Sequence, residues 1–143
     1  MNQIAYKTRA YWLGYLGLAP IILASLLVWS DLYRALAFTV VHYYSAIILT
    51  FVGAIHWGKS MDKLDTNRLT VSVLPSLHAF FCLLQPVEIA LPLLAAGFIA
   101  IYWYEYSRRL ESTWFRMLRQ RLTASVSSIL IINWVIFQNF ATQ

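Results

Sequence analysis

Long apolar runs, separated by short charged segments, dominate the chain. Five runs contain no Asp, Glu, Lys or Arg, namely residues 10–30, 35–58, 69–87, 89–104 and 122–143. A bilayer core about 30 Å thick is crossed by about 20 apolar helical residues. The pattern therefore predicts an all-α bundle of five transmembrane helices, at about residues 10–30, 36–57, 69–85, 86–106 and 122–141.

The composition supports a membrane protein over a soluble one. The chain has 143 residues, of which 60% are hydrophobic and only 12% are charged. A soluble domain carries about 25% charged residues, because its surface must face water. We therefore expect one polytopic membrane domain over residues 1–143, and neither a soluble enzyme nor a nucleic-acid binder.

The basic residues predict the orientation of the helices. Lys and Arg of short loops stay on the cytoplasmic side of a membrane. Ten of the 11 basic residues fall in the N-terminal tail and in the second-to-third and fourth-to-fifth connections, and only Arg34 falls on the opposite side. This split places the N-terminus inside and the C-terminus outside, in an inner (cytoplasmic) membrane. A cleaved signal peptide is the alternative for the first run, but residues 10–30 are longer than its usual apolar region.

The segment before the last run is basic and amphipathic. Trp114, Leu118 and Leu122 share one helical stripe, and arginines flank it. This pattern is typical of a helix that lies in the headgroup plane, where each arginine attracts anionic lipid by about 1 kcal/mol. The predicted headgroup contacts are Arg108, Arg109, Trp114, Arg116, Arg119 and Arg121.

Small residues on the first two runs predict close helix packing. They let neighbouring helix backbones approach each other in lipid. On the first run they are Gly14 and Gly17, and Pro20 should kink that helix. On the second run they are Ala46, Thr50, Gly53 and Ala54.

Four polar side chains within the runs are candidate ligand-binding residues: His42, His56, His78 and Asn133. Hydrogen bonding between helices is their commoner role. The alternative is a pocket for haem, quinone or a small solute, because a haem-bearing bundle also presents histidines from facing helices. Too few ligands converge for a zinc site. We predict no metal and no cofactor, with haem as the one cofactor to consider.

Several segments resemble a known family of membrane proteins. These are Tyr15-Leu-Gly-Leu-Ala-Pro20, the second run from Tyr44 to Gly58, Val73-Leu-Pro-Ser-Leu77 and Trp114-Phe-Arg-Met-Leu-Arg119. Together they resemble the domain-of-unknown-function 3429 family, which includes the animal transmembrane protein 69, over nearly the whole chain. The resemblance implies that His or Arg stands at the position of His56, and hence a polar or cationic role there rather than a strict metal or haem role. It implies no established activity.

The sequence contains no phosphate-binding loop, zinc motif or nucleophile elbow, and we identify no catalytic residue. We therefore expect an accessory or scaffold component of a membrane complex, with anionic lipids and other membrane subunits as partners. The alternative is a small redox or transport module that binds haem, quinone or a solute between the second, third and fifth helices.

Overall fold

The computed structural model describes residues 3–109 and 111–142, leaving out the side chain of Lys63, and this part of the chain is entirely helical apart from its connections. Six helices follow one another: α1 (Gln3–Leu16), α2 (Ala19–Leu27), α3 (Arg34–Lys63), α4 (Thr66–Leu83), α5 (Val87–Ser107) and α6 (Thr113–Ala141). The all-α prediction is confirmed.

Helices α1 and α2 are two segments of one rod, broken at Gly17 and Leu18. Pro20 lies in the first turn of α2, where its missing N–H disturbs the helix least. The break leaves the Gly17 carbonyl without its usual helical partner, and the Tyr44 hydroxyl of α3 donates to it at 3.0 Å. The predicted kink is therefore present, and α3 satisfies the polar group that it frees.

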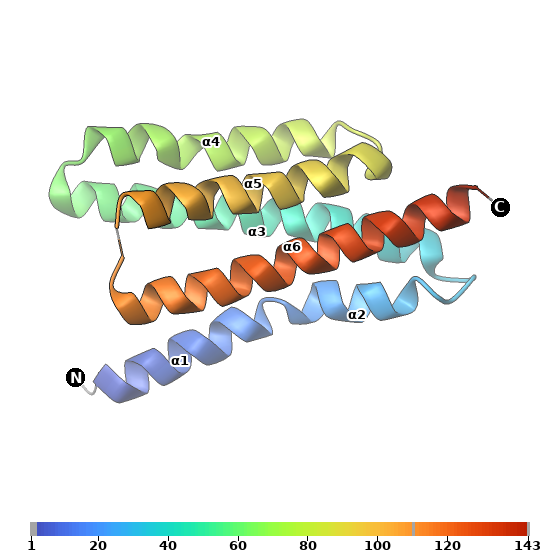
Figure 1. Cartoon of the computed structure of the whole chain (residues 1–143), viewed down its shortest axis with the longest axis horizontal. Helices are drawn as coiled ribbons and strands as arrows, with labels where there is room; N and C mark the ends of the chain where they lie inside the picture. Colours follow the sequence, from blue (N-terminus) through green and yellow to red (C-terminus); the bar gives the residue numbers. More distant parts are fainter. Residues whose placement is uncertain (1–2, 110, 143) are drawn as a thin grey trace.

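The helices run along one long axis (Figure 1). Helix α4 packs antiparallel beside α3, and α6 packs antiparallel beside α5. The start of α1, the α3–α4 turn and the α5–α6 connection all lie at one end of the bundle. We call this end the basic end, because its connections carry most of the Lys and Arg. Fully buried aliphatic side chains fill the centre between the helices, among them Ile21, Leu49, Leu91, Leu94 and Leu130.

Four helical stretches are long and apolar enough to cross a membrane: Gln3–Leu27, Arg34–Asp62, Val87–Ser107 and Thr113–Ala141. Helix α4, which covers the run predicted to be the third span, is not one of these four in the described part of the chain. Its 18 residues include Asn67, Arg68 and His78, which lower its mean hydropathy.

The prediction of a separate interfacial helix over residues 108–121 is wrong. Helix α6 begins at Thr113 and continues without interruption to Ala141, so residues 113–121 of the basic segment form its first turns, and Arg108 caps the end of α5. The reason is local, because residues 113–141 contain no Gly or Pro that would break the helix. The last span consequently begins nine residues before the predicted position of 122.

Candidate functional site: a buried ionic cluster

Six polar side chains form one hydrogen-bonded group at the basic end, which we call the ionic cluster. They are His56 and Lys59 of α3, Arg68 of α4, Glu105 of α5, Glu111 of the α5–α6 connection, and Arg119 of α6. The five on helices lie within about two turns of the helix end at the basic end, so the antiparallel arrangement of the bundle brings them to the same level. The cluster joins four helices and one connection.

Glu105 is the most enclosed carboxylate of the cluster, with 4% of its surface exposed. Arg119 donates to it with two groups: Nε lies 3.2 and 3.1 Å from Oε1 and Oε2, and Nη2 lies 3.0 Å from Oε1. His56 Nε2 lies 2.8 Å from Oε1. A fork of this kind fixes the relative position of α5 and α6, because the guanidinium and the carboxylate are both planar.

The neighbours of His56 determine which ring nitrogen carries the proton. Arg68 Nε lies 3.2 Å from His56 Nδ1, and a guanidinium can only donate. His56 Nδ1 must therefore accept, and His56 Nε2 carries the hydrogen that is donated to Glu105. The His56 ring is therefore neutral in this arrangement, and its two hydrogen bonds connect Arg68 of α4 to Glu105 of α5.

Glu111 closes the cluster on the side of the connection. It accepts from Arg68 Nη2 at 2.5 Å and from Lys59 Nζ. The Lys59 ammonium also lies over the Phe115 ring, 4.2 Å from its centroid, a favourable position for a cation. The guanidinium of Arg68 therefore bridges His56 and Glu111, and ties α3 and α4 to the segment that precedes α6.

Three cations, two carboxylates and a neutral imidazole give the ionic cluster a formal charge of +1. The Lys59 side chain is 37% exposed, but the other four charged side chains are buried. Buried charges are stable only when each is paired, because removing them from water is costly. Every carboxylate oxygen of Glu105 and Glu111 accepts from at least one cation. The arrangement is suited to fixing the packing and register of four helices at one end of the bundle.

The other three candidate ligand residues each have a partner of their own. His42 Nε2 bonds to the Cys82 carbonyl at 3.0 Å, and His78 Nε2 bonds to the Leu93 carbonyl at 2.8 Å. Asn133 donates to Ser25 Oγ at 2.7 Å and to the carbonyl of its own helix at Ile129, at 2.8 Å. These hydrogen bonds link α3 with α4, α4 with α5, and α2 with α6. The three side chains do not converge on one pocket, as a shared haem or quinone site would require.

In the part of the chain that the structure describes, no three His, Cys, Asp or Glu side chains are grouped so that they could hold a metal ion.

The predicted headgroup residues divide into two sets. Arg108, Arg109 and Arg121 are exposed at the basic end, and Arg116 is half-buried beside the Tyr106 ring. Trp114 packs edge-on against Tyr6 of α1, with Lys7 over its ring. The prediction that Arg119 contacts lipid headgroups is wrong. Its side chain is buried and bonds to Glu105, because its position on α6 faces α5.

The small residues also lie in different surroundings. A Cβ on Gly14 would come within 2.9 Å of Leu122 of α6, and one on Gly53 within 2.6 Å of the Ser72 carbonyl of α4, so both helix pairs approach closely there. A Cβ on Gly17 would meet only carbonyls of its own helix. Ala46 is buried.

The outer side of α3 carries a second set of small residues. Thr50, Ala54 and Gly58 are exposed, and a Cβ on Gly58 would have nothing within 4 Å. We call these three residues, which recur at intervals of four, the small-residue strip.

Comparison with known proteins places the chain in a family. Residues 6–135 match the model of a family described as "Protein of unknown function (DUF3429)". Over 124 residues the chain is 35% identical to Transmembrane protein 69 of Xenopus tropicalis, an alignment that covers 80% of this chain and 49% of the relative. The chain thus spans about half the length of this relative. No solved structure matches the chain.

The chain belongs to the DUF3429 family, as its sequence motifs predicted.

Proposed function

We propose that the chain is a non-enzymatic accessory or scaffold component of a membrane complex, and that it crosses an inner (cytoplasmic) membrane five times with its basic end inside. The charge distribution supports this orientation, because basic connections are retained on the cytoplasmic side. The paired polar groups support a structural role. His42, His56, His78 and Asn133 all bond to neighbouring helices, and these contacts hold the bundle together.

Helix α4 is the fifth crossing in this proposal, although its hydropathy alone does not identify it as a membrane span. It runs antiparallel to α3 along the bundle, and its 18 residues reach about 27 Å at 1.5 Å each. Along its length its polar side chains contact protein: Arg68 is buried in the ionic cluster, Ser72 is buried against α3, and His78 bonds to the Leu93 carbonyl, whereas the exposed Asn67 lies in the first turn at the basic end. A helix whose polar side chains are satisfied inside the bundle can present its remaining apolar face to lipid.

The observation that carries the scaffold role is the small-residue strip on the lipid-facing side of α3. Small residues at intervals of four allow another helix backbone to approach closely, and such contacts drive helix association in membranes. Large side chains flank the strip, including the exposed Ile47, Phe51 and Trp57. They would pack around a partner. We propose that one apolar helix of another membrane subunit packs on this strip.

The proposal is tested by replacing a small residue of the strip with a large one. Ala54→Leu would place a large side chain on the strip, whereas Ala96→Leu adds the same volume at an exposed position of α5 and serves as the matched control. Tagged protein, produced at its native level and extracted in mild detergent, should migrate as a complex on native gels. Ala54→Leu should convert it to the monomer, and Ala96→Leu should not. A wild-type protein that is already monomeric, or a complex that tolerates Ala54→Leu, would refute the proposal.

A further inference from the structure

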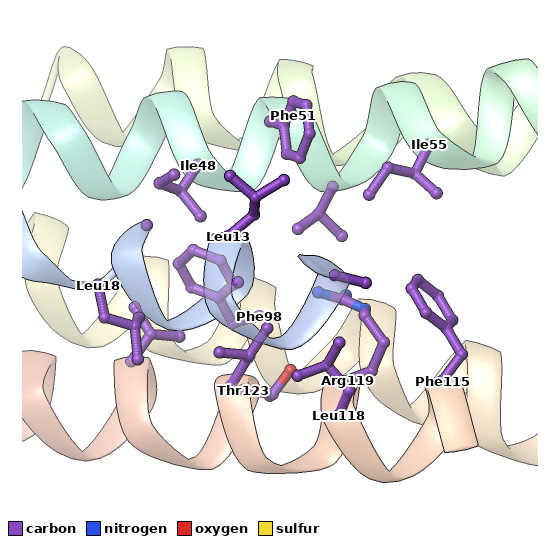
Figure 2. A pocket seen from close by; sticks show the side chains of 16 residues that line it. Leu13, Leu18, Ile48, Phe51, Ile55, Phe98, Phe115, Leu118, Arg119 and Thr123 are labelled. Atoms are coloured by element: carbon purple, nitrogen blue, oxygen red, sulfur yellow. The ribbon is translucent and has the colours of Figure 1, made fainter. Parts of the chain in front are cut away.

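A cavity of about 280 Å³ lies between α1, α3 and α6, with Phe98 of α5 at its floor. Its walls are almost wholly apolar (Figure 2). Two of its lining residues, Leu13 and Phe51, are 71% and 62% exposed. The cavity therefore opens between α1 and α3 on the surface that faces lipid.

Two polar side chains interrupt this apolar lining, and both come from α6. Figure 2 shows the oxygen of Thr123 and the nitrogens of Arg119 among carbon side chains. Arg119 uses Nε and Nη2 to bind Glu105, and its Nη1 makes no hydrogen bond to any residue that the structure describes. The cavity thus offers a guanidinium N–H and a hydroxyl on one wall.

Four described residues have a buried side-chain N or O atom without a hydrogen-bond partner, namely Thr123, Ser127, Asn133 and Trp134, and of these Thr123 lines the cavity. Thr123 is 6% exposed, yet its hydroxyl has no hydrogen-bond partner among the described residues. Other threonines in the helices behave differently: the hydroxyls of Thr39, Thr50 and Thr70 each donate to the carbonyl four residues earlier, at 2.9 to 3.0 Å. A buried hydroxyl left without a partner costs about 1–3 kcal/mol. Thr123 therefore lacks a bond that a ligand oxygen in the cavity could supply.

The size and charge of the cavity restrict what that ligand can be. A dry apolar cavity of about 150 Å³ accepts one benzene ring, so this cavity has room for one ring and part of a chain. The charge of Arg119 is already matched by Glu105. The excess positive charge of the cluster lies with Lys59 and Arg68, which share Glu111. A neutral oxygen acceptor therefore fits better beside Arg119 than a carboxylate, which would lie next to the like charge of Glu105.

We propose that this cavity binds the ring of a membrane quinone, with one carbonyl oxygen accepting from Thr123 and Arg119 and the isoprenoid tail leaving between α1 and α3. The site is distinct from the small-residue strip, although Phe51 borders both. The cavity is lined by Ile48, Val52 and Ile55 of α3, whereas the small-residue strip lies on another side of that helix.

The proposal is tested by photolabelling of the whole protein in phospholipid nanodiscs with a decyl benzoquinone that carries a diazirine. Labelled peptides should come from the α1, α3 and α6 segments that line the cavity. Unlabelled decyl benzoquinone should compete, whereas dodecane and dodecanoate should not. Equal competition by dodecane would show that any apolar chain fills the space, and stronger competition by dodecanoate would show an anionic head group. Either result, or labelling elsewhere, would overturn the proposal.

Two variants separate binding from folding. Thr123→Val keeps the shape and removes an unpartnered hydroxyl, so the melting temperature should stay equal or rise, while the affinity for the quinone should fall about three- to tenfold. Ala10→Phe should block the cavity from α1 without touching the hydroxyl. Thr39→Val, on an exposed hydroxyl of α3, is the control and should bind as wild type. Unchanged binding by Thr123→Val, as expected if a water satisfies this hydroxyl, would refute the proposed contact.

Discussion

Replacing Glu105 by glutamine tests the ionic cluster most sharply, because it removes a charge and hardly changes the volume. Glu105 accepts from Arg119 at 3.0 to 3.2 Å and from His56 at 2.8 Å. Glu105→Gln would leave the buried guanidinium of Arg119 without its counter-ion and would set the amide N–H₂ against a donor. Breaking a buried pair on one side costs about 3–5 kcal/mol. Because one oxygen of glutamine still accepts, we expect a loss near the lower limit, about 3 kcal/mol.

The assay is reversible unfolding in mixed micelles, with SDS as the denaturant and helix content followed by circular dichroism. Glu88→Gln is the matched control, since Glu88 lies at the other end of α5 and forms no ion pair with any described residue. It should change the free energy of unfolding by less than about 0.5 kcal/mol. Combining Glu105→Gln with Arg119→Gln should cost less than the sum of the two single changes, because the double variant leaves no unpaired charge. Additive effects, or a loss below about 1 kcal/mol for Glu105→Gln, would show that the pair contributes little.

Two further predictions concern helix packing. Gly53→Ala should destabilise the bundle by about 1–3 kcal/mol, because its Cβ would lie 2.6 Å from the Ser72 carbonyl, whereas Gly58→Ala should be neutral or stabilising by up to about 1 kcal/mol. Equal effects in the same unfolding assay would rule out the close approach of α3 and α4. Asn133→Leu should cost at most about 0.6–1.7 kcal/mol, the values for hydrogen bonds between membrane helices, because it also removes a buried Oδ1 that has no partner among the described residues, and adding Ser25→Ala should then cost little. Full additivity of these two changes would mean that their hydrogen bond does not stabilise the protein.

Sequence reasoning predicted the helical character and the kink because both depend on local properties. An apolar run of about 20 residues indicates a membrane helix, and Pro20 lacks the N–H that would continue the hydrogen-bond ladder of the preceding helix. It placed the start of the last helix wrongly because it treated arginine as a signal for the end of a span. Arg119 shows why this fails: a charge inside a membrane helix is tolerated when another helix supplies its counter-ion.

Only the general location of the ionic cluster, and not its pairing, could be predicted from the sequence. The predicted spans place the ends of α3 and α5 and the start of α4 on the same side, which is consistent with His56, Glu105 and Arg68 lying near one another, but no contact among them was predicted. The pairing itself depends on how each helix is rotated about its axis. That rotation follows from packing around contacts such as Gly53 on α4, and hydrophobic periodicity alone does not define it.

Labelling of single cysteines by a membrane-impermeant maleimide would test the five-crossing topology most directly. Cys82 is first replaced by alanine, and single cysteines are then introduced at the exposed residues Leu32, Asp62, Leu84 and Ser107. The Leu32→Cys and Leu84→Cys variants should react in intact cells. The Asp62→Cys and Ser107→Cys variants should react only after permeabilisation. Reaction of Asp62→Cys and Leu84→Cys from the same side would contradict the crossing of α4, and reaction of Asp62→Cys or Ser107→Cys in intact cells would contradict a cytoplasmic basic end.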